Sequence, residues 1–181
     1  MSLVVRSLAG SSPSERVIYS PRKTQVSNNS DAVLPTGTVT LLLADVVGST
    51  RLWESRPVVM AAALVAMDRL LGHLVPAHHG VCPVEQGEGD SFVIAFAHAA
   101  DAVACALALQ QAPLTPLRLR VGVHTGTVQL RDEHKYMGPT VNRAARLTSL
   151  ASAGATWADR PTVDAVRAPD GHRLERLVVS A

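Results

Sequence analysis

The sequence predicts an α/β (α+β) fold with a ferredoxin-like β-α-β-β-α-β core. Two observations carry this prediction. Apolar segments of strand character alternate with two longer segments of helical periodicity, in the order strand, helix, strand, strand, helix, strand. The second and third strands are separated by a short glycine-containing turn, which favours a hairpin. With 181 residues, 47% of them hydrophobic, the chain is long enough for one domain with a substantial core.

Residues 1–36 differ in composition from the rest of the chain. They are rich in Ser, Asn, Pro and Arg, which is typical of segments that bury too little apolar surface to fold. We therefore expect a flexible N-terminal arm over residues 1–36 and a folded domain over residues 37–181. A short strand around residues 17–19 is an alternative within the arm.

The first expected strand runs from about Thr38 to Ala44 and ends at a lone carboxylate, Asp45. A glycine three residues later permits a tight turn, and Ser49 or Thr50 can cap the helix that follows. An anion could bind to the free N–H groups of that helix, with Asp45 beside it to hold a divalent cation. Strand, acid, turn and helix together suggest a metal–phosphate site, although an aspartate that closes a strand is more often structural.

The first helix is indicated by apolar residues at helical spacing, which are Leu64, Met67, Leu71, Leu74 and Val75. We expect Pro57 to break this helix locally or to start a second segment. Three histidines gather near its end: His73, His78 and His79. We interpret them as solvated residues, with a role as ligands as the alternative.

Two short strands are expected over residues 81–86 and 91–96. The turn between them, Gly87-Glu88-Gly89-Asp90, predicts a hairpin. Asp90 then lies at the hairpin tip, just as Asp45 lies at a strand end. A surface turn residue is the alternative interpretation of this aspartate.

A second helix and a fourth strand complete the predicted core. The helix is expected over residues 101–111. The strand is expected over residues 117–124, where apolar and other residues alternate as in a half-buried strand. We expect residues 125–127 to break it or to form a bulge before residues 128–130, and residues 131–135 to form a polar loop.

The last expected elements begin with a helix that starts at the glycine–proline pair 138–139, since proline is tolerated at an early helical position. Asn142 and Arg146 are four residues apart and therefore share one face of this helix. A solvated face is the alternative to a functional one. A short helix near residues 161–166 and a strand near residues 174–179 are expected to close the chain.

Charge and composition exclude several classes of protein. The formal net charge of +2 is small and the basic residues are dispersed, so nothing marks a nucleic-acid-binding surface. Cys82 and Cys105 are too few for a disulfide framework and fit a reducing compartment. We find no uncharged apolar stretch of about 18 residues and no secretion signal. We therefore expect a cytoplasmic protein without a membrane span.

In the predicted topology the first strand lies beside the hairpin, so Asp45 and Asp90 could converge on one pair of metal ions. With this pair in view, the chain resembles the class III adenylate/guanylate cyclase catalytic domain. The resemblance is to the actinobacterial type that is often fused to transcriptional regulators. Four motifs carry it in the order of the family: LLADVVGST (42–50), EQGEGDSF (85–92), VGVHTG (121–126) and GPTVNRAARL (138–147).

The resemblance implies conversion of a purine nucleoside triphosphate, ATP or GTP, into a 3′,5′-cyclic monophosphate and pyrophosphate. Two Mg²⁺ or Mn²⁺ ions held by Asp45 and Asp90 would assist attack of the ribose 3′-oxygen on the α-phosphate. Asn142 would position the ribose, and Arg146 would stabilise the pentavalent transition state. The phosphates would lie against the backbone of Val46, Val47, Gly48, Ser49 and Thr50.

The resemblance also implies a head-to-tail homodimer. In the family one protomer supplies the metal-binding residues and the other supplies the asparagine and the arginine. A single chain would then hold no complete site.

The chain departs from the family at the residues that select the base. Gln86 stands where adenylate cyclases commonly have Lys and guanylate cyclases have Glu, and Lys135 stands where its usual partner is Asp or a small polar residue. Gln86 can donate and accept, so it does not choose adenine from guanine. Lys135 adds only donors, which favours the guanine O6 acceptor if it points inward, and a solvent-exposed position is the alternative. A late lysine that contacts the triphosphate is also replaced, with Glu175 at or near its position and Arg173 and Arg176 as substitutes.

We therefore predict a nucleotide cyclase with eroded base selection. The alternative is a cyclase-like regulatory domain that binds nucleotide, or only dimerises, without turnover. A ferredoxin-like RNA-binding domain is disfavoured, because it needs exposed aromatic residues on its sheet and only 3% of this chain is aromatic.

Overall fold

The computed structural model describes residues 3–6, 33–83, 89–131 and 134–167. Its main sheet has five strands in the order β1-β7-β4-β2-β3, with β2 antiparallel to both neighbours and β7 parallel to β4. The strands are β1 (Leu3–Arg6), β2 (Thr38–Val46), β3 (Ser91–Phe96), β4 (Leu119–Thr127) and β7 (Ala155–Ala158). A second sheet pairs β5 (Gln129–Arg131) with β6 (Lys135–Met137).

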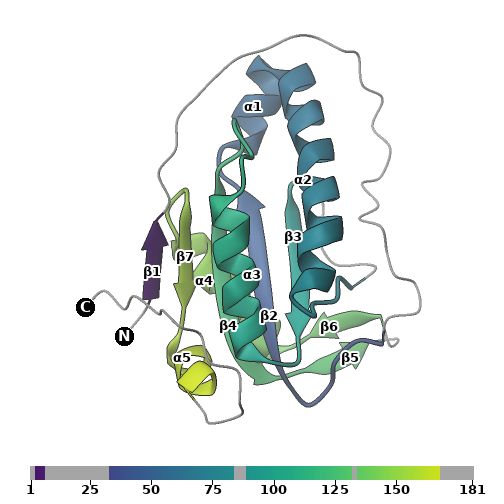
Figure 1. Cartoon of the computed structure of the whole chain (residues 1–181), viewed down its shortest axis with the longest axis vertical. Coiled ribbons are helices and arrows are strands. Elements are labelled where there is room, and N and C mark those ends of the chain that lie inside the picture. Colours follow the sequence, from purple (N-terminus) through teal and green to yellow (C-terminus); the bar gives the residue numbers. More distant parts are fainter. Residues whose placement is uncertain (1–2, 7–32, 84–88, 132–133, 168–181) are drawn as a thin grey trace.

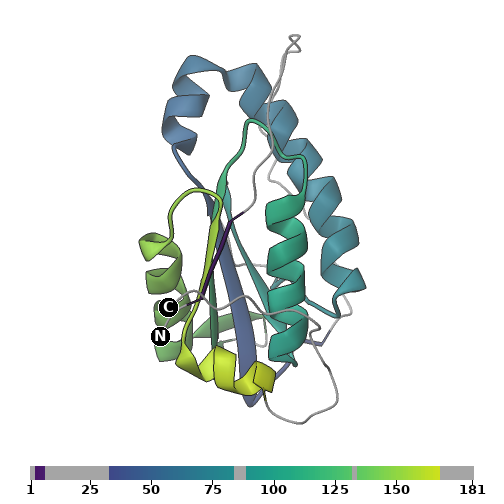
Figure 2. The same cartoon turned by 60° about the vertical axis from the view of Figure 1, so that its left-hand side comes forward.

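Helices cover both faces of the main sheet. Figures 1 and 2 show α2 and α3 on one face and α4 on the opposite face. The helices are α1 (Ser49–Ser55), α2 (Pro57–Ala77), α3 (Ala99–Gln111), α4 (Pro139–Leu150) and α5 (Arg160–Arg167). Pro57 and Pro139 each stand in the first turn of their helix, where a missing N–H costs nothing.

The ferredoxin-like core is confirmed. β2 lies between β4 and β3, and Val81 forms an antiparallel bridge with Ala95 on the far side of β3. Of the strand expected over residues 81–86, residue 81 forms only this bridge and residues 82–83 are not in a strand, while residues 84–88 lie outside the described part of the chain.

Two apolar layers explain why β2 is apolar along almost its whole length. Leu42, Ala44 and Val46 belong to the cluster that packs under α2 and α3. Leu41 and the partly buried Leu43 belong to a cluster with residues of α4 and with Tyr136 of β6. Both faces of β2 are therefore covered, and the polar end of the strand at Asp45 stands out.

α2 is long and apolar enough, by length and composition alone, to cross a membrane. It contains Asp68 and Arg69, so it is not the uncharged apolar stretch whose absence was expected. Its buried residues recur at helical spacing and pack on the sheet; they include Met60, Leu64, Met67, Leu71 and Val75.

The segment expected to be a flexible arm contains ordered parts. Residues 3–6 form β1, which pairs with β7 along its whole length. Leu34 is buried, and the Pro35 carbonyl accepts a hydrogen bond from the Tyr136 hydroxyl at 2.7 Å. The alternative strand at residues 17–19 lies outside the described residues, and the domain boundary at residue 37 stays a prediction.

The second half of the chain differs from the expectation in two elements, β4 and β7. β4 continues through residues 125–127 without the expected break, because it stays paired with β2 as far as Thr127. β7 was not expected. α5 confirms the expected short helix, whereas the strand expected near residues 174–179 lies outside the described residues.

Candidate active site

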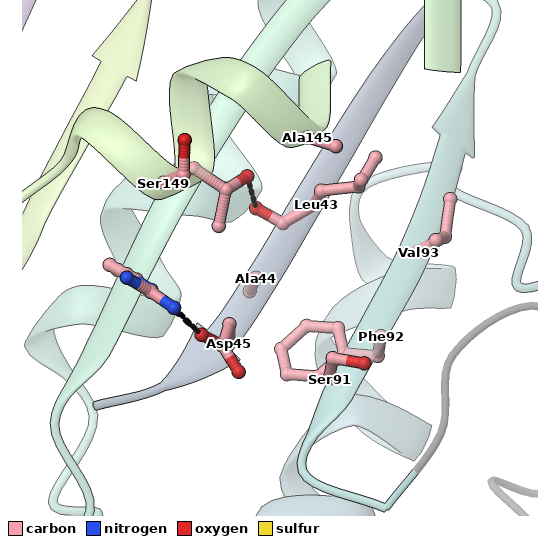
Figure 3. A pocket seen from close by; sticks show the side chains of 10 residues that line it. Leu43, Ala44, Asp45, Ser91, Phe92, Val93, Ala145 and Ser149 are labelled. Atoms are coloured by element: carbon pink, nitrogen blue, oxygen red, sulfur yellow. Dashed lines mark hydrogen bonds and ion pairs between the residues drawn. The ribbon is translucent and has the colours of Figure 1, made fainter. Parts of the chain in front are cut away.

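Asp45 lies in a pocket between the C-terminal half of α4 and the ends of β2 and β3 (Figure 3). In the sheet register Asp45 stands directly opposite Ser91 of β3 on one side and Arg120 of β4 on the other. The pocket has a volume of about 430 Å³. It is lined by Leu43, Ala44, Asp45, Ser91, Phe92, Val93, Arg120, Ala145, Thr148 and Ser149.

Arg120 is the site residue that the sequence analysis missed. Its Nε donates a hydrogen bond to Oδ2 of Asp45 at 2.7 Å, and its Nη2 forms an ion pair with the same oxygen. The alternation of residues in β4 indicates that Arg120, Gly122 and His124 share one face of the strand. It does not show that Arg120 contacts Asp45, because that contact depends on the register of β4 against β2.

Asp90 lies at the same end of the sheet as Asp45. The main-chain N–H of Val46 donates to the Asp90 carbonyl at 3.2 Å, and Asp90 directly precedes Ser91, the partner of Asp45. The backbone positions of Asp45 and Asp90 are therefore close together, as expected, and Asp90 lies in the turn before β3. Their shared role as metal ligands remains a proposal.

The turn after Asp45 differs from the expectation in two ways. Gly48, with φ of 71°, is the residue that caps α1, and neither Ser49 nor Thr50 provides a side-chain cap. Ser49 instead begins the helix. The N–H groups of Val46 and Val47 are already bonded, to the carbonyls of Asp90 and Arg118, so only the N–H groups that follow them remain to contact an anion.

α4 sits close to β4 because two glycines make room for it. A Cβ atom on Gly122 would lie 2.6 Å from the Ala144 carbonyl oxygen, and one on Gly126 would lie 2.9 Å from Oγ1 of Thr140. Thr148 adds a hydrogen bond from its hydroxyl to the Leu43 carbonyl at 3.1 Å. The helix is thereby held against the strands that carry Asp45 and Arg120.

His124 lies between these two glycines and is almost fully buried. Its Nδ1 is 2.6 Å from Oδ2 of Asp159, the residue that precedes α5. Its Nε2 has no hydrogen-bond partner among the described residues. We interpret this pair as a structural link between β4 and the start of α5.

Asn142 and Arg146 are not brought into this pocket. Both side chains are exposed, and neither makes a hydrogen bond or ion pair within the described part of the chain. The α4 residues that line the pocket are Ala145, Thr148 and Ser149. Asn142 and Arg146 therefore lie on a solvent-exposed face of α4, where they are accessible to a partner molecule.

The expected base-selecting residues are only partly described. Lys135 is exposed at the first position of β6, and Gln86 lies outside the described residues, as do Arg173, Glu175 and Arg176. The histidines near the end of α2 form no metal cluster, since the described residues contain no group of three potential ligands. Nδ1 of His79 instead lies 3.4 Å from Oδ2 of Asp101, and the His79 side chain is 77% exposed.

Comparison with known protein families identifies this architecture. The model of the adenylate and guanylate cyclase catalytic domain matches residues 32–169. The chain belongs to this cyclase family. The resemblance inferred from the four sequence motifs is thereby confirmed.

Relatives and solved structures agree with this assignment. The chain is 51% identical over 154 residues to the uncharacterized protein Rv0891c of Mycobacterium tuberculosis. The matched region covers 85% of this chain and 52% of the relative. The chain thus spans about half the length of the mycobacterial relatives it matches.

Two solved structures share the fold. Adenylate cyclases from Trypanosoma brucei in their monomeric state match with 28% identity and a TM-score of 0.63, over 75% of this chain and 78% of theirs. The adenylate/guanylate cyclase/hydrolase from Silicibacter pomeroyi matches with 26% identity and a TM-score of 0.63, over 75% of this chain and 83% of its own.

Proposed function

We propose that this chain is a cytoplasmic nucleotide cyclase that converts ATP or GTP into a 3′,5′-cyclic monophosphate and pyrophosphate. The observation that carries the proposal is the position of Asp45 and Asp90 at one end of two paired strands, beside the pocket that also contains Arg120. Two acids so placed in a cyclase-family fold form the core of a site for divalent cations.

The donor chemistry fits Mg²⁺ or Mn²⁺. Oδ1 of Asp45 accepts no hydrogen bond from a described residue, so one carboxylate oxygen is uncommitted. No third acidic or histidine ligand joins the cluster in the described part of the chain. Ions of this kind are commonly held by one or two carboxylates together with waters and substrate phosphates. Bound there, they would activate the ribose 3′-hydroxyl and offset the charge of the leaving pyrophosphate.

The remaining groups are supplied by a second copy of the chain. Asn142 and Arg146 are exposed and stand apart from the pocket of their own chain. We propose a head-to-tail homodimer in which Asn142 orients the ribose and Arg146 stabilises charge on the reacting phosphate, a task suited to a planar cation with several donors. The free N–H groups at the start of α1 would contact the phosphates.

The second candidate function is a regulatory domain that binds nucleotide or dimerises without turnover. It is favoured by Gln86 and by the exposed, cationic Lys135, since neither forms the pair that selects a purine. Without this pair the purine base would be held loosely, and the reaction would therefore be slow.

Metal-dependent turnover distinguishes the two candidates. Purified protein is incubated with ATP or GTP and Mn²⁺, and cyclic products are separated by chromatography. We expect Mn²⁺-dependent product that is lost in Asp45→Ala and in Asp90→Ala, while Asp164→Asn on the exposed side of α5 serves as the control. Nucleotide binding without any product would support the regulatory domain, and unchanged Mn²⁺ dependence in Asp90→Ala would exclude the metal assignment.

A further inference from the structure

We propose that Arg120 is a built-in competitor for the metal site: it neutralises Asp45 in the metal-free protein and lowers the affinity of the site for a divalent cation. The inference rests on the proposed function, because it takes Asp45 as a metal ligand. It adds a role for Arg120 that precedes any contact with nucleotide.

The geometry shows a charge pair formed entirely by two residues of this chain. Nε and Nη2 of Arg120 both contact Oδ2 of Asp45, and Figure 3 shows the second carboxylate oxygen directed away from this contact. The two residues stand opposite each other in the β2–β4 register, so the backbone fixes their separation. Their side chains are 24% and 36% exposed, Asp45 being the more buried.

Two physical effects oppose metal binding at such a carboxylate. A cation that approaches Asp45 is repelled by the positive charge of Arg120, because the Arg120 side chain directly contacts the carboxylate that would bind the cation. A cation that uses both carboxylate oxygens must also displace the two donors from Oδ2. Because the pair is partly buried, the effective dielectric constant is below that of water and the repulsion survives moderate salt.

A role as a scaffold predicts the opposite sign. If Arg120 mainly held the Asp45 side chain in a binding-ready rotamer, its removal would weaken metal binding. If it acts as a competitor, its removal strengthens metal binding. The direction of the change in affinity therefore decides between the two roles.

The test is the dissociation constant for Mn²⁺ alone, without nucleotide, measured by titration calorimetry and by the electron paramagnetic resonance signal of free Mn²⁺. We compare the wild type with R120Q, R120K, R118Q and D45N. R118Q is the matched control, because Arg118 is also near the start of β4 but donates to the Ala153 carbonyl at 3.0 Å outside the pocket. Thermal unfolding checks each variant, and R120M replaces R120Q if R120Q does not fold.

We expect R120Q to bind Mn²⁺ about tenfold more tightly at low salt, as removal of one positive charge near a divalent ion predicts. The gain should shrink at high salt. R120K, which keeps the charge, and R118Q should stay within about twofold of the wild type. Unchanged or weaker binding in R120Q, with binding still dependent on Asp45, would overturn the inference and leave the proposed function intact. Mn²⁺ binding unaffected by D45N would overturn the metal assignment itself.

Discussion

Gly122 of β4 lies directly beneath Ala144 of α4, so close that a Cβ atom on the glycine would be 2.6 Å from the Ala144 carbonyl oxygen. Gly122→Ala should therefore lower the free energy of unfolding by about 1–3 kcal/mol, the cost of overpacking a well-packed contact. Chemical denaturation measures this change.

Gly72 provides the matched control for this substitution. It lies inside α2, and a Cβ atom there would meet nothing within 4 Å. Gly72→Ala should raise the free energy of unfolding by about 0.5–1 kcal/mol, because alanine is the better residue inside a helix. Equal effects of the two substitutions would show that α4 adjusts easily above β4.

Complementation tests the composite site. Asp45→Ala and Arg146→Ala each inactivate one half of a head-to-tail dimer, and a mixed dimer holds one site with both halves intact. If the wild type is active, mixing the two inactive proteins should restore part of the activity. A mixture of Asp45→Ala with Asp90→Ala should restore none, because both changes fall in the same half. Absence of recovery in demonstrated heterodimers would contradict the dimer proposal.

Base selection should be weak. An amide such as that of Gln86 can donate or accept and so can satisfy either purine edge. Lys135 adds only donors, and it is exposed in β6. We expect less than about tenfold difference in kcat/KM between ATP and GTP with Mn²⁺, roughly 1.4 kcal/mol of differential stabilisation.

The double variant Gln86→Lys with Lys135→Asp provides the check on this placement. It should shift the preference toward ATP, because it restores the pair that adenylate cyclases commonly use. A ratio that does not move would show that these two residues do not read the base. A hundredfold preference in the wild type would show that another contact does.

Asp68 on α2 should make stability depend on pH. Burial raises its pKa from 3.8 to about 6, and it has no hydrogen-bond or ion-pair partner in the described part of the chain. The folded protein therefore holds this proton more tightly than the unfolded chain. The contribution of Asp68 to stability is present below pH 3.8 and is lost as the pH rises through about 6.

Asp68→Asn removes this titration. The variant should be more stable than the wild type at pH 7, and the difference should approach zero near pH 3.8 when denaturation is compared across this range. Asp164→Asn is the control for the loss of a negative charge, because Asp164 lies on the exposed side of α5, where it accepts a hydrogen bond from Arg160 at 2.8 Å. A pH-independent effect of Asp68→Asn would exclude the proposed proton uptake.

The sequence predicted the elements whose pattern is local. β2, α2, β3, α3 and α4 have clear apolar periodicity or a proline in the first turn, and they were found within a few residues of their expected bounds. β7 was missed because its four residues, Ala-Thr-Trp-Ala, are too short to show alternation.

The sequence predicted only those site residues that a local sequence pattern identifies. Asp45 stood out because a carboxylate ends an apolar strand. Its contact with Arg120 depends on the register between β2 and β4, which no local pattern fixes. The cap at Gly48 was missed because serine and threonine are the usual capping residues, whereas here the left-handed backbone of glycine makes the turn.

The close seat of α4 has a mechanical consequence. The helix meets β4 through main-chain atoms at Gly122, so no change of side-chain rotamer can raise or lower it. Interiors packed to this density transmit displacement rather than absorb it. Helix α4 and strand β4 should therefore move together as one rigid unit in any displacement of the domain.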